Sequence, residues 1–270
     1  MDEYLRANRL LWDKWTREHE ASEFYDVAGF KVGRDRLRSI ELKEVGDVSG
    51  KSLLHLQCHF GLDTLAWARR GAVVTGTDLS EESITLARSL SEELQIPARF
   101  VCCDLYDLPD HLAGTFDIVF TSYGVLHWLR DLAPWGRLIS HFLKPGGFFY
   151  IVEDHPTFRM FTTENGTDIK LDNPYFFAEA PSQNEITGSY ATNFQGEVST
   201  FYMWDHGLGD VLNALIDAGL TIEFLHEYPF APRAKFPFME QHADGWWYLP
   251  ERYVQIPFLF SLKARKPLSL

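Results

Sequence analysis

The amino-acid sequence predicts an α/β fold: a doubly wound, mostly parallel seven-stranded sheet with an antiparallel edge strand and an inserted lid. Strand-like and helix-like segments alternate up to about residue 155, as expected where helices connect parallel strands by right-handed crossovers. The alternation stops there and resumes near residue 208. The last two strand-like segments have no clear helical segment between them, which predicts an antiparallel hairpin at the sheet edge.

The first part of the chain contains five of the predicted strands and three of the predicted helices. Each strand is an apolar run bounded by turn residues, and each helix has apolar residues at helical spacing. Pro97 ends the second helix. In chain order these segments are strand 51–58, helix 61–70, strand 72–80, helix 81–96, strand 98–105, strand 115–124, helix 132–143 and strand 148–153.

Residues 156–205 are rich in Thr, Asn, Gly and aromatic residues and show no regular pattern. A connection of this length is usually a functional lid or a small subdomain. Helix 208–220 and strands 221–229 and 256–266 then complete the predicted sheet.

The composition of the 270 residues excludes several classes of function. A formal net charge of −13 makes a nucleic-acid partner improbable, because such binding depends on clustered Lys and Arg. No apolar run is long enough to cross a bilayer, and the charged N-terminal sequence is unlike a signal peptide. The odd set of Cys58, Cys102 and Cys103 is typical of a reducing compartment, so we expect a cytoplasmic protein.

A nucleotide site is predicted where the first strand ends. A dinucleotide-binding turn would read G-x-G-x-x-G there, but only Gly61 is present. Asp78 follows Gly61 by 17 residues and ends the second strand, near the spacing at which an acid binds ribose hydroxyls. The pattern favours a nucleoside cofactor without a pyrophosphate.

Residues 51–154 resemble the cofactor domain of the class I S-adenosylmethionine-dependent methyltransferases, especially the bacterial small-molecule enzymes. The first family motif, approximately hhD-h-G-x-G-x-G, aligns with LLHLQCHFG at 53–61, where His55 replaces the acid, Gln57 and His59 replace glycines, and Gly61 matches. Asp78 matches the second motif. The segments CCDL, FDIVFTSYGVLHWL and LKPGGFFYIVE match the later ones.

The resemblance implies a Rossmann-like sheet, S-adenosyl-L-methionine as cofactor and S-adenosyl-L-homocysteine as product. Together with the sequence patterns above, it divides the chain into four predicted regions: an N-terminal helical cap (1–45), a cofactor-binding core (46–155), an inserted lid that binds the acceptor (156–205), and a C-terminal completion of the sheet (206–270). Asp104 is expected at the adenine amino group and Leu105 beside the ring. The full set of expected cofactor-binding residues is Gln57, Cys58, His59, Gly61, Asp78, Leu79, Ser80, Asp104, Leu105, Ser122 and Tyr123. No metal is expected, because strand alternation points His55, Cys58 and His59 in different directions.

Methyl transfer is an in-line displacement, so the protein mainly aligns the reactants and excludes water. Where a proton must be removed, the candidate bases are Tyr123 and His127, followed by Glu153 and His155. The expected acceptor-binding residues are Tyr190, Tyr202, Trp204 and His206, whose alternative role is the core of a small subdomain. The N-terminal helix with Trp12 and Trp15 is expected to close over the cofactor or to form a dimer contact.

The predicted function is methylation of a small-molecule acceptor. Two alternatives stay open: a non-catalytic protein that binds S-adenosylmethionine and, with less support, a nucleotide-dependent oxidoreductase, against which the missing glycines count. The sequence identifies neither the acceptor nor the oligomeric state.

Overall fold

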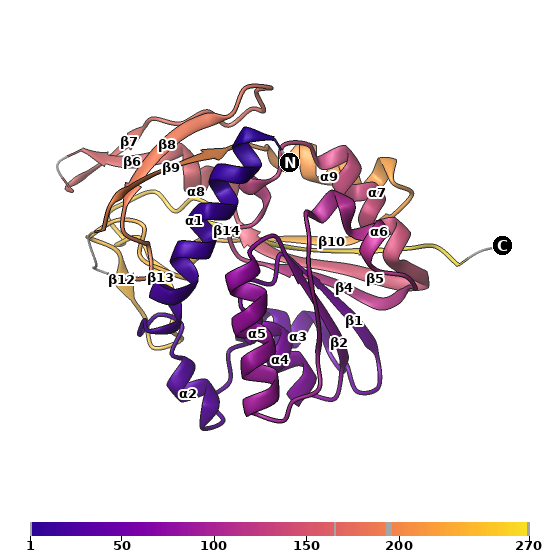
Figure 1. Ribbon diagram of the computed structural model, residues 1–270. Helices are drawn as coiled ribbons and strands as arrows, with labels where there is room; N and C mark the ends of the chain where they lie inside the picture. The colour runs from indigo at the N-terminus through magenta and orange to yellow at the C-terminus, as the bar shows by residue number, and fades with distance from the viewer. Residues whose placement is uncertain (1, 165, 193–195, 269–270) are drawn as a thin grey trace.

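The computed structural model describes residues 2–164, 166–192 and 196–268, and its centre is a seven-stranded sheet (Figure 1). The strand order is β10-β14-β5-β4-β1-β2-β3. These strands are β1 (Ser52–Leu56), β2 (Val73–Asp78), β3 (Arg99–Cys102), β4 (Phe116–Ser122), β5 (Leu143–Asp154), β10 (Thr221–Tyr228) and β14 (Leu259–Arg265).

The predicted seven-stranded, mostly parallel sheet is confirmed. β1, β2, β3, β4 and β5 pair in parallel, whereas β14 runs antiparallel to both β5 and β10. The predicted terminal hairpin therefore lies at the sheet edge, with β14 one place inside it and β10 outermost.

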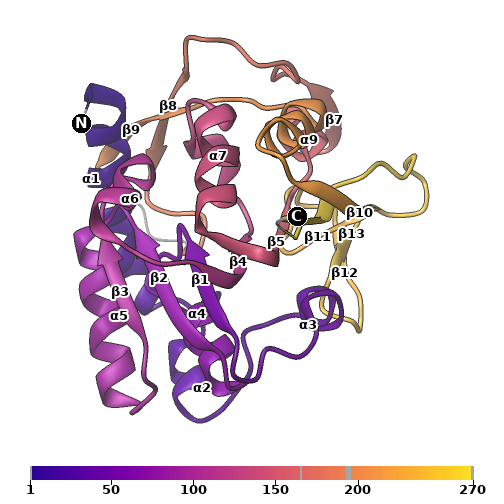
Figure 2. The same ribbon diagram turned by 90° about the vertical axis from the view of Figure 1, so that its right-hand side faces the viewer.

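Helices cover both faces of the sheet (Figure 2). One face packs against α3 (Ser39–Val45), α4 (Leu62–Arg69) and α5 (Glu81–Glu93) through a core that includes Leu53, Phe120 and Tyr150. The other face packs against α6 (Leu108–His111), α7 (Leu132–Phe142) and α9 (Leu208–Asp217) through Leu54, Val119 and Phe149. Neighbouring residues of one strand therefore enter opposite cores, as strand alternation requires.

Two glycines fix how helices meet their neighbours. Gly61 precedes α4 at φ 76°, and a Cβ on it would lie 2.7 Å from the Phe100 ring. A Cβ on Gly136 of α7 would lie 2.1 Å from the Ala214 carbonyl oxygen of α9. Only glycine allows both approaches, because any Cβ would force the neighbouring element away.

The segment predicted to be irregular contains regular structure. After α8 (Pro156–Met160) come the hairpins β6 (Phe161–Glu164)–β7 (Asp168–Leu171) and β8 (Ser182–Thr187)–β9 (Val198–Met203). The connection between β10 and β14 holds a small sheet of β11 (Phe230–Ala231), β12 (Glu240–Gln241) and β13 (Trp247–Tyr248). The sequence patterns did not predict these elements, nor α2 (Val27–Lys31) and α3.

The N-terminal helix α1 (Glu3–Glu20) lies between α5 and the β8–β9 hairpin (Figure 1). Leu11 and Trp15 on α1 form a small core with Phe201 on β9. Asn8 strengthens this packing, since its amide donates to the Tyr202 carbonyl oxygen at 2.8 Å and accepts from the Tyr202 N–H at 2.8 Å. The helix and the hairpin are therefore joined by both apolar and polar contacts.

Candidate functional site

A cavity of about 450 Å³ lies where the loops after β1, β2 and β4 meet α1 and the β8–β9 hairpin. In doubly wound sheets ligands bind at this place, beyond the carboxyl ends of the strands. Most of the predicted site residues line it: Gln57, Cys58, His59, Gly61, Asp78, Leu79, Asp104, Leu105, Ser122, Tyr123, His127, Tyr190 and Trp204.

The loop after β1 keeps a backbone path that normally calls for glycine. Gln57 and His59 have φ of 53° and 52°, and Gly61 follows at 76°. For a residue with a Cβ this left-handed conformation costs about 1–2 kcal/mol. Three backbone hydrogen bonds hold the path: Cys58 N to Thr77 O at 2.9 Å, Gly61 N to Cys58 O at 2.9 Å, and His59 N to Asp78 Oδ2 at 2.7 Å.

Asp78 connects this loop to the end of β2. Its Oδ2 accepts from His59 N, and its Oδ1 accepts from Ser80 N at 2.9 Å. Burial raises the pKa of Asp78 to about 6, although these amide hydrogen bonds oppose the shift. Each carboxylate oxygen keeps a second lone pair for a ligand hydroxyl.

Asp104 and Leu105 follow β3 on the same cavity wall. The Asp104 carboxylate accepts from Tyr106 N at 3.0 Å and so caps the short helix Leu105–Asp107. Burial raises the pKa of Asp104. Leu105 is buried and lines the cavity beside it. The arrangement places one acceptor and one apolar surface side by side.

A series of side-chain hydrogen bonds begins at Thr16 on α1, passes through α5 and the loop after β1, returns to α1 and ends in the connection of the β8–β9 hairpin. It links Thr16 Oγ1 to Ser83 Oγ at 2.6 Å, Ser83 Oγ to His59 Nδ1 at 2.9 Å, His59 Nε2 to His19 Nδ1 at 2.8 Å, and His19 Nε2 to Ser189 Oγ at 2.6 Å. Burial lowers the pKa of His19 to about 3, and burial together with His19 lowers that of His59 well below its usual value. Both rings are therefore neutral at pH 7.

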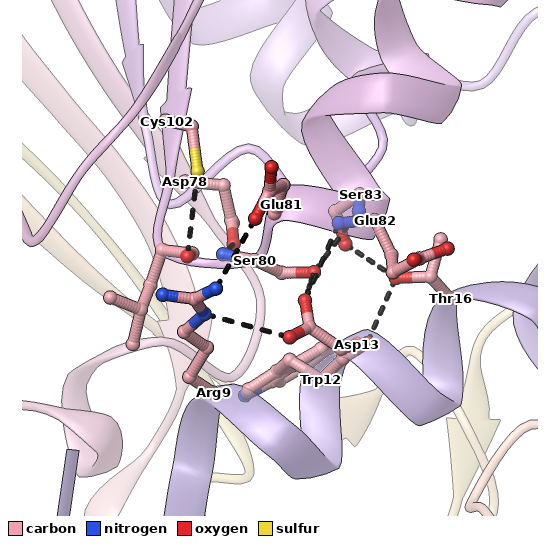
Figure 3. Close-up of polar contacts among 11 residues, drawn as sticks. Arg9, Trp12, Asp13, Thr16, Asp78, Ser80, Glu81, Glu82, Ser83 and Cys102 are labelled. Atoms are coloured by element: carbon pink, nitrogen blue, oxygen red, sulfur yellow. Dashed lines mark hydrogen bonds and ion pairs between the residues drawn. The ribbon is translucent and has the colours of Figure 1, made fainter. Parts of the chain in front are cut away.

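Polar contacts also clamp α1 onto the start of α5 (Figure 3). Asp13 Oδ1 accepts from Ser80 Oγ at 2.7 Å and from Glu82 N at 3.4 Å. Arg9 lies 3.6 Å from the other oxygen of Asp13 and 3.3 Å from a Glu81 oxygen. Because Trp12 and Trp15 on the same helix line the cavity, the clamp holds an aromatic cover over it.

Two phenols and two arginines form another part of the cavity wall. The hydroxyls of Tyr25 and Tyr190 are hydrogen-bonded to each other. The Arg36 guanidinium lies 5.6 Å from the centre of the Tyr25 ring, and the Arg233 guanidinium lies 5.7 Å from that of Tyr190. Arg233 is held by Asp154, with Nη2 2.8 Å from Oδ2. Burial raises the pKa of both tyrosines, which keeps them protonated.

Three predicted site residues do not line this cavity. Ser80 is fully buried as the N-cap of α5, where it accepts from Ser83 N at 3.0 Å and donates to Asp13. Tyr202 packs its ring against Tyr4 at 4.7 Å. His206 stacks on Phe177 and binds the Leu129 carbonyl oxygen at 2.7 Å. All three make contacts within the fold, and their roles in binding stay predictions.

The four candidate bases have different surroundings. Tyr123 donates its hydroxyl to Glu41 at 2.9 Å, and His155 pairs with Glu227 at 2.9 Å. The Glu153 carboxylate accepts from the amides of residues 124, 125, 126 and 154, so it fixes the loop after β4. His127 lines the cavity, and burial followed by the charges of Arg159 and Arg233 lowers its pKa well below the usual value. His127 is therefore a neutral ring at the cavity wall.

Sequence reasoning missed the cavity residues Tyr25, Arg36, Arg38, Asp63 and Arg233. Asp63 accepts from the Ser122 hydroxyl at 3.3 Å, and burial raises its pKa. Asp63 directly follows the first motif and could have been found from that position. Arg233 had no such signal, because it comes from the long β10–β14 connection. The described residues contain no cluster suited to a metal ion, and no described helix has the length and apolarity to span a membrane.

Part of the chain matches a known family and curated relatives. Residues 54–151 match the family described as "Methyltransferase domain". The chain is 29% identical over 145 residues to the ubiquinone biosynthesis O-methyltransferase of Chromobacterium violaceum, covering 54% of this chain and 59% of that one. It is 34% identical over 132 residues to the protein of the same name from Idiomarina loihiensis, covering 47% and 54%. The chain thus spans less than two thirds of these relatives.

The fold also resembles the folds of solved structures. An S-adenosylmethionine-dependent methyltransferase from Mesorhizobium loti superposes with a TM-score of 0.57 at 22% identity, covering 84% of this chain and 96% of that one. The sequence match and the sheet order agree: residues 54–151 match a methyltransferase domain, and the chain shares the fold of solved S-adenosylmethionine-dependent methyltransferases.

Proposed function

We propose that the protein transfers a methyl group from S-adenosyl-L-methionine to a small-molecule acceptor. The observation that carries the proposal is the loop after β1, which keeps the left-handed path of a glycine-rich motif at Gln57 and His59. Such strain persists only where surrounding structure enforces it and is typical of functional sites. Here Asp78 enforces it while lining the cavity itself.

The cavity residues fit the chemistry of the cofactor. Asp78 would hold the ribose hydroxyls, and Asp104 and Leu105 would hold the adenine. Gln57 Oε1 is buried and has no hydrogen-bond partner within the described ranges, so it can accept from a ligand ammonium group. Asp63 and Ser122 offer further polar atoms on the same wall. The cofactor, when bound, supplies a methyl group activated by its sulfonium.

The chain's own residues would position the acceptor and exclude water. Trp12 and Trp15 on α1 cover the cavity together with Trp128 and Phe201, and these rings pack against one another. His127 is the neutral ring available to take a proton from the acceptor nucleophile, while Tyr123 orients the loop through Glu41. We propose Tyr190 and Trp204 as acceptor-binding residues, because both line the cavity.

We also propose that the acceptor is not a nucleic acid and that the protein acts in the cytoplasm. The formal net charge of −13 supports the first statement, because phosphate backbones require clustered cations. Three cysteines without a disulfide among them support the second.

The test has two steps. Calorimetry should show binding of S-adenosyl-L-homocysteine in the micromolar range and no comparable binding of NAD. Labelled methyl from S-adenosylmethionine should then enter a small molecule of a metabolite extract, whereas the Asp78→Ala variant should transfer far less. Asp110→Ala, which removes an exposed acid, is the matched control. Binding of NAD without S-adenosylhomocysteine, or binding without any transfer, would contradict the proposal.

A further inference from the structure

Four arginines line the cavity of a strongly acidic protein: Arg36, Arg38, Arg130 and Arg233. Arg36 approaches Asp63 only to 3.9 Å, and Arg38 donates to the Pro232 carbonyl oxygen at 3.1 Å and stacks over Trp246 at 4.7 Å. Lys235 lies close by, over the Phe158 ring at 4.7 Å. Asp63 pairs with Arg36 and Asp154 pairs with Arg233, whereas no carboxylate of the described residues forms an ion pair with Arg38 or Lys235.

Arg233 is the arginine best placed to hold a ligand. Its pairing with Asp154, whose side chain is 3% exposed, and its position over the Phe158 ring at 5.0 Å fix the guanidinium. A guanidinium has five N–H donors. Within the described ranges Arg233 makes one hydrogen bond, to Asp154, so most of its donors remain for the cavity that it lines.

The cofactor brings no net negative charge to the wall around Arg233. Its methionine end carries one carboxylate and one ammonium group, and the sulfonium adds a further positive charge. Cations buried without counter-charges are costly. The wall around Arg233 therefore favours an acceptor group that brings negative charge.

Resting on the proposed function, we propose that the acceptor is a small organic acid whose carboxylate is bound by Arg233 beside Tyr190. Carboxylates suit this position because a guanidinium binds them with two parallel hydrogen bonds. The body of the acceptor is flat and unsaturated, because the remaining wall is formed by indole and phenyl rings of Trp12, Trp15, Trp128 and Phe201. A carboxylate at this position also offsets the charges of Arg159 and Arg233 that act on His127, which makes His127 a stronger base.

The test compares charged probes with neutral ones of the same shape. Benzoate and benzamide, and cinnamate and cinnamamide, are titrated calorimetrically into the full chain saturated with S-adenosylhomocysteine. Each acid should bind about ten- to hundredfold more tightly than its amide, the range expected for a charge-assisted contact. Arg233→Met should abolish this preference, Arg233→Lys should restore part of it, and both should keep the affinity for S-adenosylhomocysteine within about twofold.

Two further variants control for net charge and for folding. Arg252→Met removes an exposed arginine of the same β10–β14 connection and should leave the preference unchanged. The double variant Arg233→Met with Asp154→Asn removes both charges of the pair and should again bind acid and amide alike. The proposal is overturned if the native chain binds acid and amide equally, or binds neither. It is also overturned if Arg233→Lys loses affinity for S-adenosylhomocysteine, because that result would place the cofactor's own carboxylate at Arg233. Failure of the native chain to bind S-adenosylhomocysteine would instead overturn the proposed function.

Discussion

Replacing His59 tests whether the loop after β1 is strained. His59→Gly and His59→Ala lose the same two side-chain hydrogen bonds, to His19 at 2.8 Å and to Ser83 at 2.9 Å. At about 1 kcal/mol each, both variants should lose roughly 2 kcal/mol of unfolding free energy. The difference between them isolates the backbone, because Ala must keep its Cβ at a φ of 52°.

The expected difference has an unusual sign. Left-handed backbone destabilises the folded Ala variant by about 1–2 kcal/mol. The greater freedom of Gly in the unfolded chain destabilises the Gly variant by roughly 0.5–1 kcal/mol. His59→Gly should therefore be more stable than His59→Ala by about 0.5–1 kcal/mol. Ser89, which is exposed within α5, provides the control. At this helical position Ser89→Ala should be more stable than Ser89→Gly by about 1 kcal/mol.

Urea unfolding followed by tryptophan fluorescence and circular dichroism measures these differences as shifts in midpoint. The same sign as at His59 is expected for Gln57→Gly against Gln57→Ala, because φ there is 53°. If Ala proves as stabilising as Gly at both positions, the loop is not strained and its backbone path cannot be the feature that replaces the missing glycines.

Three more outcomes are expected. Asp78→Ala should weaken S-adenosylhomocysteine binding by about ten- to hundredfold and more than Asp104→Asn does, because an amide oxygen still accepts a hydrogen bond; calorimetry giving the reverse order would show that the two acids have been assigned wrongly. The pKa of His19 is about 3 in the folded chain and about 6.5 in the unfolded chain, so the unfolded chain binds a proton first as the pH falls. His19 should therefore lower the free energy of unfolding by about 2 kcal/mol between pH 7 and pH 5. In urea titrations His19→Gln should reduce this loss, whereas His111→Gln, at an exposed position, should not. Asp13→Ala should free α1 from α5, so that cofactor release in stopped-flow experiments and amide exchange in α1 both accelerate, whereas no change relative to the exposed Glu20→Ala would show that the contacts of Asp13 do not control closure.

The sequence predicted those parts of the molecule that have a local signal. All seven strands of the main sheet lie in segments that are apolar or that alternate apolar and polar residues, and α5 follows its N-cap Ser80 and ends before Pro97, as capping chemistry requires. The β8–β9 hairpin was missed because its first strand, SQNEIT, is largely polar and exposed. Short helices such as α3 contain too few turns for a periodic pattern to show.

The site divides in the same way. Gly61, Asp78 and Asp104 occupy motif positions and all line the cavity, whereas Ser80 adjoins a motif but uses its side chain as a helix cap. Arg36 and Arg233 are far apart in sequence and meet the cavity only through tertiary packing. No spacing rule could have predicted that both flank the phenol pair of Tyr25 and Tyr190.

The hydrogen-bond chain through the two histidines has only one consistent arrangement of its protons. Thr16 donates its single hydroxyl proton to the Trp12 carbonyl oxygen at 2.8 Å, so Ser83 must donate to Thr16. His59 must then carry its proton on Nδ1, His19 must carry its own on Nδ1, and Ser189 must donate to His19 Nε2. The hydrogen bond that Thr16 donates to Trp12 thus fixes the tautomers of both rings. Thr16→Val would remove the first hydroxyl of the series without changing either ring. The direction of the Ser189 hydroxyl, four hydrogen bonds away, would then no longer be fixed.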